Sequence, residues 1–364
     1  MNKRLNLLGS VSGTGYGVVT FNILKYMTEQ GWDISLFPKG GTDRTNPEEI
    51  SLISNAVNRS KTFDFDAPCL NIWHQFDLAN HIGYGKYVAY PFFELDTLKP
   101  LEIHHLNYPD ELIVSSEWAR LIVEQNGVTT KTNVIPPGVD LIKFNPNKQY
   151  DSNYHNDNTV FLNCGKWEVR KGHDILVDVF NDAFEPTDNV ELWMMPTNVF
   201  LNETETKAWE SLYLNSNMGR AGKIKILPWC KTHGEVAATM AKADCGVFPA
   251  RAEGFNLELL EILALGKPVI ATYYSAHTEF INNDNAYLIT IDDVELAYDG
   301  RWFNNEGHWA YIGDSQIEQC VEHMRTVHKW KQDGKNMHSS GGVETAQKFC
   351  WENTAEKIGK ILLT

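Results

Sequence analysis

The sequence predicts an α/β protein built from two doubly wound domains. Three observations lead to this prediction. Strand-like and helix-like segments alternate along most of the chain, a stretch rich in Pro, Asn and Asp at 132–158 interrupts the alternation, and 364 residues suffice for two domains of ordinary size. Such alternation favours parallel sheets with helices on both faces.

The first half reads as one Rossmann-like domain over residues 1–145. Its helices are expected at 18–31, ended by Gly31, and at 116–127, opened by Ser116 and ended by Gly127. Its strand-like segments are 4–9, 33–38, 69–74, 87–93 and 111–116. The Pro- and Asn-rich stretch that follows is typical of a linker.

The second half reads as another Rossmann-like domain, over residues 146–345. Its strand-like segments are 159–165, 190–196, 224–229, 245–250 and 268–272, and its helical ones include 173–184 and 234–243. Residues 345–363 predict one amphipathic helix. We expect the C-terminal segment, 346–364, to pack back on the N-terminal domain.

Composition narrows the classes of protein. None of the apolar stretches approaches the roughly 20 residues of a membrane span, and the N-terminus lacks the pattern of a signal peptide, so we expect a cytoplasmic protein without integral membrane contact. The six cysteines form no C-x-x-C pair, so neither a disulfide framework nor a zinc site is predicted. A formal net charge of −15 disfavours a general nucleic-acid binder. The sequence leaves the oligomeric state open.

The run from 250 to 271 is the most informative part of the chain. Glu253 stands in a predicted strand-to-helix loop and Glu261 lies eight positions later, inside the helix. The glycine after Glu253 allows a tight turn, and amides at a helix N-terminus favour a phosphate. Gly266 and Pro268 then end the helix. The predicted substrate-binding residues of this run are Gly254, Phe255, Asn256, Leu257 and Glu261.

A basic turn follows the first strand of the second domain. It carries Lys166, Arg170 and Lys171 in front of a predicted helix. Fixed cations at such a place can neutralise the charge that develops on a leaving phosphate. A solvated basic turn and a helix with two exposed Glu residues are the alternative interpretations of the two motifs.

Together these motifs resemble the retaining family 4 glycosyltransferases, whose Glu-x7-Glu signature and flanking "EGF" and "ALGKPVIAT" segments match residues 253–272. The resemblance implies a GT-B fold, with two Rossmann-like domains facing across a cleft, and a nucleotide diphosphate-sugar as donor substrate, with no further cofactor. It implies that Lys166 and Lys171 stabilise the phosphate, with Arg170 as an alternative partner. Glu253 would orient the donor sugar and Glu261 would hold the ribose.

A glycine-rich loop follows the first predicted strand. Gly13, Gly15 and Gly17, with Tyr16 between them, would let a ligand approach the backbone in front of a helix. The spacing departs from the G-x-G-x-x-G dinucleotide fingerprint, which argues against a nicotinamide-dependent dehydrogenase. In the family, a glycine-rich loop here faces the donor phosphate and the acceptor.

Three further residues are candidates. Many family members place a His near the reacting sugar, where this chain has Phe92, Phe93 and Glu94, so either Glu94 takes that role or His74 does. A structural His74 is the alternative. Trp229 falls where the family has its base-binding loop, with a core position as the alternative.

The sequence also supports predictions about metal dependence and about the acceptor. The histidines lack metal-ligand spacing, and Asp64-Phe65-Asp66 reads as a loop, so a metal-independent enzyme is expected. A saccharide or glycan is the preferred acceptor. The segments "TGYG" and "LFPKG" resemble glycosyltransferases of large tailed bacteriophages, some of which modify DNA bases, so a hydroxymethylated DNA base is an alternative. A nucleotide-sugar epimerase and a non-catalytic nucleotide-sugar binder are two further alternatives for the function of the protein.

Overall fold

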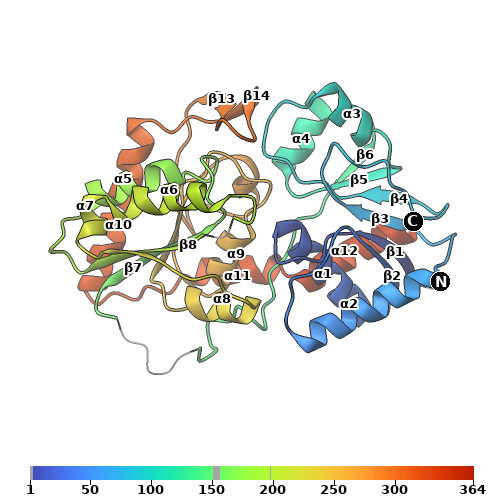
Figure 1. Cartoon of the computed structure of the whole chain (residues 1–364), viewed down its shortest axis with the longest axis horizontal. Helices are drawn as coiled ribbons and strands as arrows, with labels where there is room; N and C mark the ends of the chain where they lie inside the picture. Colours follow the sequence, from blue (N-terminus) through green and yellow to red (C-terminus); the bar gives the residue numbers. More distant parts are fainter. Residues whose placement is uncertain (1–2, 151–155, 197) are drawn as a thin grey trace. The chain divides into compact units, whose positions relative to one another are not determined.

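The computed structural model of the chain describes residues 3–150, 156–196 and 198–364 (Figure 1). It divides into two compact units. One comprises Met1–Val139 with Lys348–Thr364, and the other comprises Asp140–Gln347. The chain thus passes between the units at Val139 and again at Lys348, where the sequence predicted boundaries after residues 145 and 345.

The N-terminal unit contains a six-stranded parallel sheet of order β2-β1-β3-β4-β5-β6. Its strands are β1 Arg4–Gly9, β2 Asp33–Pro38, β3 Cys69–Ile72, β4 Tyr87–Ala89, β5 Glu111–Val114 and β6 Lys131–Val134. Its helices are α1 Gly15–Glu29, α2 Pro47–Arg59, α3 Pro100–Leu106, α4 Glu117–Gln125 and α12 Trp351–Leu363, with a 3-10 turn at Ser60–Thr62. The central strands β3, β4 and β5 are buried throughout, as expected for parallel strands covered on both faces.

The C-terminal unit repeats this architecture with the sheet order β12-β11-β10-β7-β8-β9, again all parallel. Its strands are β7 Thr159–Gly165, β8 Val190–Pro196, β9 Ile224–Ile226, β10 Cys245–Phe248, β11 Val269–Thr272 and β12 Tyr287–Ile289. Its helices are α5 His173–Ala183, α6 Glu203–Leu214, α7 Asn217–Arg220, α8 His233–Met240, α9 Leu257–Ala264, α10 Asp314–Gln332 and α11 Ser340–Lys348, with a 3-10 turn at Ser275–Glu279.

Five predicted strands, β3, β4, β5, β9 and β10, end earlier than the sequence suggested. β3 stops at Ile72, which pairs with Gly9, the last residue of β1. Beyond that point the neighbouring strand has ended, so the ladder cannot continue. β4 likewise stops at Ala89 and β9 at Ile226. The side chains that follow these strands therefore lie in loops at the carboxyl edge of each sheet.

Two other predictions are corrected. The linker expected from residue 132 begins inside β6, which pairs with β5 through Val134 and Val114; the linker also includes 151–155, outside the described residues. The single helix expected over 345–363 is two helices, α11 and α12. Between them the backbone of Phe349 accepts a hydrogen bond from the Val139 N–H at 3.0 Å, and Cys350 is extended, which interrupts the helical ladder.

One feature, a hairpin, has no counterpart among the sequence predictions, whereas the sequence does predict that the C-terminal segment packs on the N-terminal unit. An antiparallel hairpin, β13 Val294–Tyr298 and β14 Asn304–Ala310, extends from the C-terminal unit (Figure 1). Helix α12 packs against α1 in the N-terminal unit, where Gly359 leaves room for the Trp32 ring. Because α12 is buried at Trp351, Ile358 and Leu362, the C-terminus is part of the N-terminal core.

Candidate active site

The candidate active site of the C-terminal unit is formed by the loops after three neighbouring strands. β11, β10 and β7 are adjacent in the sheet, and their carboxyl ends share one edge. The loop after β7 carries Lys166, Arg170 and Lys171, and the loop after β10 carries Glu253. In doubly wound sheets, ligands bind at this edge.

A chain of ion pairs joins these loops. The Glu253 carboxylate accepts a hydrogen bond from Lys171 Nζ at 2.7 Å on one oxygen and from Arg170 Nη1 at 2.7 Å on the other. Arg170 Nη2 reaches Glu168 at 2.8 Å, and Lys166 Nζ reaches the other oxygen of Glu168 at 2.8 Å. The structure thus brings together three of the four predicted catalytic residues and Arg170, and adds Glu168.

This network is buried except at Lys166. Glu253 is 5% exposed, whereas the Lys166 side chain is 38% exposed. Burial alone would raise the pKa of Glu253, but Arg170 and Lys171 hold that pKa well below its usual range. Burial opposes the charge on Lys171, yet Glu253 and Glu258 raise the pKa of its ammonium. Both groups are therefore charged at neutral pH.

Two glycines allow the loop after β7 to place these charges. Gly165 has φ +144°, and a Cβ there would lie 2.9 Å from Lys171 Cδ, so the lysine side chain lies over this glycine. Gly172 has φ +74°, and a Cβ there would lie 2.1 Å from the Pro249 carbonyl oxygen. A side chain at either position would separate the two loops or displace Lys171.

Neutral histidines hold the two loops in place. His173 Nδ1 accepts a hydrogen bond from the Glu168 N–H at 3.2 Å, so its Nε2–H donates to Asn163 at 2.8 Å. Burial lowers the pKa of His173 to about 3. His277 similarly donates from Nδ1 to the Thr272 carbonyl at 2.9 Å and accepts from Asn256 at 2.9 Å. Sequence reasoning missed both histidines because neither has a motif spacing.

The turn before α9 is made differently from the expectation. Asn256 is the left-handed residue, with φ 80°, whereas the tight turn was expected at Gly254. The Asn256 side chain caps the helix by accepting from the Leu259 N–H at 3.2 Å. The Phe255 ring packs on Phe280 with centroids 4.9 Å apart. The predicted role of the segment from Gly254 to Leu257 in phosphate binding therefore rests on backbone groups.

Glu261 lies in α9, about one helical turn after its first residue. It is buried in α9 and receives a hydrogen bond from His233 Nε2 at 3.1 Å. His233 begins α8 and packs edge-on against Phe144, at 5.6 Å between ring centroids. Burial raises the pKa of Glu261, and His233 opposes that shift. His233, which sequence reasoning did not single out, orients this carboxylate.

Trp229 lies in the loop after β9 and is 54% exposed. A core position for this ring is therefore wrong. An exposed indole can stack on a flat ring, so the prediction of base binding stays open.

In the N-terminal unit, the predicted glycine loop connects β1 to α1. A Cβ at Gly17 would lie 2.1 Å from the Ser12 carbonyl oxygen, so the loop closes tightly on the first helical turn. Gly15 begins α1 with open space around its Cα. The Gly13 N–H donates to the Asp43 carboxylate at 2.7 Å, so an anionic group already contacts this loop.

Aromatic side chains surround the loop. The Tyr16 ring contacts those of Trp73, His74 and Phe92, with centroids 5.5, 4.5 and 5.5 Å away. Tyr16 also donates to the Phe92 carbonyl at 3.1 Å, and its burial and the nearby Glu94 raise its pKa. The structure thus brings His74, Glu94 and Tyr16 together at the carboxyl edge of the N-terminal sheet.

Among the described residues, no group of three or more His, Cys, Asp or Glu side chains could hold a metal ion. Asp64 lies before a turn and pairs with Arg4 at 2.8 Å. None of the described helices is both long and apolar enough to cross a bilayer.

Residues 158–299, which carry both charged loops, match the family model described as glycosyl transferases group 1. A Mycobacterium tuberculosis GDP-mannose-dependent alpha-(1-6)-phosphatidylinositol dimannoside mannosyltransferase is 26% identical over 67% of this chain and 60% of its own length. A protein of Sulfolobus islandicus filamentous virus that bears the name of a glycosyltransferase is 22% identical over 77% of this chain and 74% of its own length. This chain therefore covers less than two thirds of the length of the mycobacterial relative.

Solved structures agree on the fold. Anabaena HepE in complex with UDP and glucose superimposes with a TM-score of 0.71, at 17% identity over 99% of both chains. Sucrose-phosphate synthase of Thermosynechococcus elongatus gives a TM-score of 0.70, at 16% identity over 99% of this chain and 98% of that one. The solved structures show that the chain has the GT-B fold, and residues 158–299 are similar to the glycosyl transferases group 1.

Proposed function

We propose that the protein transfers a sugar from a nucleotide diphosphate-sugar to a saccharide hydroxyl, with retention of the anomeric configuration. The observation that carries this proposal is the buried pairing of Glu253 with Arg170 and Lys171, at the carboxyl ends of β10 and β7. The charged groups lie inside the segment that matches the family model.

The charge of the network suits a diphosphate. Lys166, Arg170 and Lys171 carry three positive charges, and Glu168 and Glu253 carry two negative ones, which leaves a formal charge of +1. The Lys171 ammonium has three N–H groups and uses one of them on Glu253. Its other donors can bind the leaving phosphate.

In the proposed reaction, the bond between the anomeric carbon and the donor phosphate oxygen breaks, and the acceptor hydroxyl oxygen bonds to that carbon on the same face. The acceptor proton passes to the leaving phosphate. Lys171 and Lys166 stabilise the charge that develops there, because fixed cations in a dry site contribute most where charge appears. Glu253 orients the donor sugar.

The relatives support the class of donor. The mycobacterial relative is named as GDP-mannose-dependent, and HepE was solved with UDP and glucose. We assign the ribose to Glu261 and stacking on the base to the exposed ring of Trp229. Which nucleotide and which sugar bind is the first question for experiment.

A saccharide acceptor fits the N-terminal unit. Its candidate site offers aromatic faces, at Tyr16 and Trp73, beside the Glu94 carboxylate, and sugars present both C–H faces and hydroxyls. Several cations of this unit pair with acids: Lys39 pairs with Asp77 at 3.2 Å, for example. Other such ion pairs include Arg44–Glu49, Arg59–Asp33 and Lys86–Glu111.

A hydroxymethylated DNA base is the second candidate acceptor, because the segments "TGYG" and "LFPKG" resemble glycosyltransferases of large tailed bacteriophages. A duplex acceptor needs a row of free cations that follow the phosphates, and base flipping to expose the hydroxyl. The local ion pairs of the N-terminal unit count against such a row.

A thermal-shift screen against UDP-, GDP- and ADP-sugars tests the donor assignment. A ligand at 100 times its Kd stabilises the folded state by about 2.7 kcal/mol. We expect one nucleotide class to raise Tm in wild type and less in Glu261→Gln. Transfer assays with that donor then distinguish a glycosyltransferase from the two alternatives. An epimerase would convert the donor sugar in the absence of an acceptor, and a non-catalytic binder would leave the donor intact.

Two further measurements complete the test. Proton NMR of the first product formed should show the same anomeric configuration as the donor. Activity should persist in EDTA, because Lys171 and Arg170 supply the positive charge that a metal would provide. Inversion of configuration would contradict the retaining mechanism, and loss of activity in EDTA, restored by Mg²⁺ or Mn²⁺, would contradict metal independence.

A further inference from the structure

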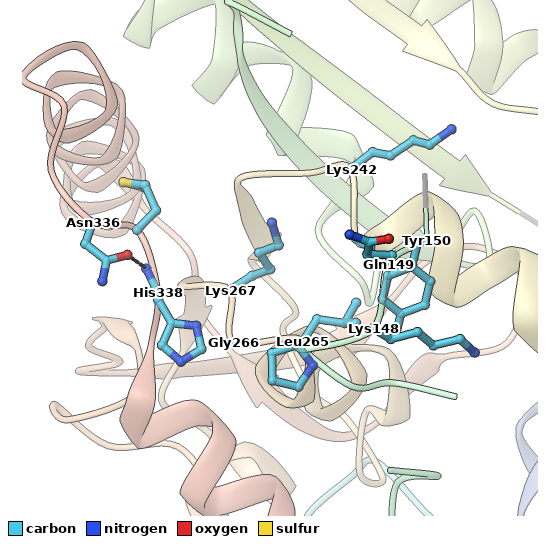
Figure 2. A pocket seen from close by; sticks show the side chains of 12 residues that line it. Lys148, Gln149, Tyr150, Lys242, Leu265, Gly266, Lys267, Asn336 and His338 are labelled. Atoms are coloured by element: carbon cyan, nitrogen blue, oxygen red, sulfur yellow. Dashed lines mark hydrogen bonds between the residues drawn. The ribbon is translucent and has the colours of Figure 1, made fainter. Parts of the chain in front are cut away.

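The C-terminal unit contains a hollow that is separate from the candidate active site. Its volume is about 430 Å³. It is lined by Pro146, Lys148, Gln149, Tyr150, Ala241, Lys242, Leu265, Gly266, Lys267, Asn336, Met337 and His338 (Figure 2). We call it the lysine pocket, after Lys148, Lys242 and Lys267. Small-molecule sites commonly have volumes of about 300 to 1,000 Å³.

The lysine pocket lies at the opposite edge of the sheet from the charged loops. Lys242 comes shortly before β10, which begins at Cys245, and Lys267 comes shortly before β11, which begins at Val269. Both lysines thus stand at the amino ends of parallel strands. Glu253 and Lys171 follow the carboxyl ends, so a ligand in this pocket would not occupy the proposed donor site.

The charge of the pocket contrasts with that of the chain. Three of its twelve lining residues are lysines and none is acidic, in a protein with a formal net charge of −15. The Lys267 ammonium makes no hydrogen bond or ion pair with any residue that the structure describes. Burial lowers the pKa of Lys267, with Asp244 opposing. An anion bound in the pocket would pair with the Lys267 ammonium and so offset the cost of burying its charge.

The walls of the pocket are held in shape by specific contacts. Gly266 ends α9 with φ +69°, and a Cβ there would lie 2.4 Å from the His338 ring. The His338 N–H donates to Asn336 Oδ1 at 2.9 Å, as the dashed line in Figure 2 shows. On the other side, the Asn145 N–H donates to the Tyr150 hydroxyl at 2.8 Å. Figure 2 shows Lys267 between these two segments.

The lining indicates the chemistry of the ligand. Lysine ammonium groups bind phosphate as point charges and tolerate several geometries. The Tyr150 ring, Leu265 and Met337 provide apolar contact for an organic body, and Gln149 and Asn336 offer amides. A bare ion would leave most of the volume unused. We propose that the lysine pocket binds a small phosphomonoester, such as a sugar phosphate, independently of the donor site.

Isothermal titration calorimetry with glucose 6-phosphate, inorganic phosphate and glucose tests the proposal. We expect glucose 6-phosphate to bind wild type more tightly than inorganic phosphate does, and glucose not to bind. Lys267→Gln should weaken glucose 6-phosphate binding by about ten-fold, since a hydrogen bond between charged partners is lost. Lys148→Gln, on the segment before β7, should weaken it too and tests the pocket without touching the core.

Matched controls locate the binding. Lys329→Gln removes an exposed lysine of the same unit, outside the pocket, and should bind glucose 6-phosphate as wild type does. Lys171→Gln, in the proposed donor site, should also retain it. Equal binding by wild type, Lys267→Gln and Lys148→Gln would overturn the proposal, as would loss in Lys171→Gln alone. Absence of glucose 6-phosphate binding to wild type, or tighter binding of inorganic phosphate, would overturn it as well.

Discussion

The two units use the same six-stranded parallel architecture and place different chemistry at the carboxyl edge of the sheet. The C-terminal unit buries a charged network there, centred on Glu253 and Lys171. The N-terminal unit places the rings of Tyr16 and Trp73 there, and its Lys39 is neutralised by Asp77. Fixed charge suits a diphosphate leaving group, whereas apolar faces suit a sugar ring. Under the proposed function, the C-terminal unit binds the donor and the N-terminal unit binds the acceptor.

The largest expected effect on stability concerns Glu253, the buried carboxylate of the C-terminal unit. Glu253→Gln leaves Lys171 buried without its anion and leaves Arg170 paired with Glu168 alone, and breaking a buried ion pair in this way costs about 3 to 5 kcal/mol. We expect that loss in the free energy of unfolding, measured by urea denaturation. Glu203→Gln is the control, because this exposed partner of Lys207 should contribute less than about 0.5 kcal/mol.

The pH dependence of the same variant is a sharper measurement. The folded pKa of Glu253 lies well below the usual value of 4.5, so its stabilising effect is present above that value and is lost as pH falls through the folded pKa. The difference in unfolding free energy between wild type and Glu253→Gln should be constant near neutrality and shrink below pH 4.5. A difference that already shrinks between pH 7 and 6 would contradict this assignment.

Activity should be most sensitive to the buried cation. Lys171→Met keeps the aliphatic part of the side chain and removes the charge, and loss of one group that stabilises a developing oxyanion costs about 100- to 1,000-fold in kcat. Lys166→Met should cost less, because Lys166 is partly exposed and pairs with Glu168. Lys225→Met, a surface control, should retain activity. Wild-type kcat/KM in both Lys171→Met and Lys166→Met would remove the basis of the phosphate assignment.

A substitution at Gly165, the glycine beneath the Lys171 side chain, should have a smaller effect on activity. Gly165→Ala introduces a Cβ 2.9 Å from Lys171 Cδ at φ +144°, so the flexible lysine must move. We expect kcat/KM to fall about ten-fold, with about 1 to 3 kcal/mol lost from stability through backbone strain. Gly222→Ala is the matched control: it also has a positive φ, +73°, but open space around it. Equal activity loss in both variants would attribute the effect to strain alone.

Some strands and charged loops were predictable from the sequence, for a physical reason. Parallel strands buried on both faces are continuous apolar runs, so β7 and β8 were predicted at their observed bounds. Charged groups that must lie at set points on a glycine-shaped loop leave a motif, as Lys171 and Glu253 do. His277 and His233 leave none, because each acts through contacts with residues distant in sequence.

The ends of elements were the least predictable. Whether a strand continues past Ile72 depends on where its neighbour stops, and the split between α11 and α12 depends on Val139, more than 200 positions away. The β13–β14 hairpin was missed because its strands mix exposed apolar and polar residues and lack the buried alternation of a core strand.

The smallest expected effect concerns the acceptor and salt. If the N-terminal unit binds a neutral saccharide, KM for the acceptor should hardly change with ionic strength. A DNA acceptor would show log–log slopes of about −0.9 for each phosphate neutralised. Asp77→Asn sharpens the test, because it releases Lys39 from its ion pair. We expect this variant to leave acceptor KM unchanged. Steep salt dependence of duplex DNA binding, strengthened in Asp77→Asn, with sugar transfer to a hydroxymethylated base, would reverse the acceptor assignment. The donor assignment would stand, because it rests on residues of the other unit.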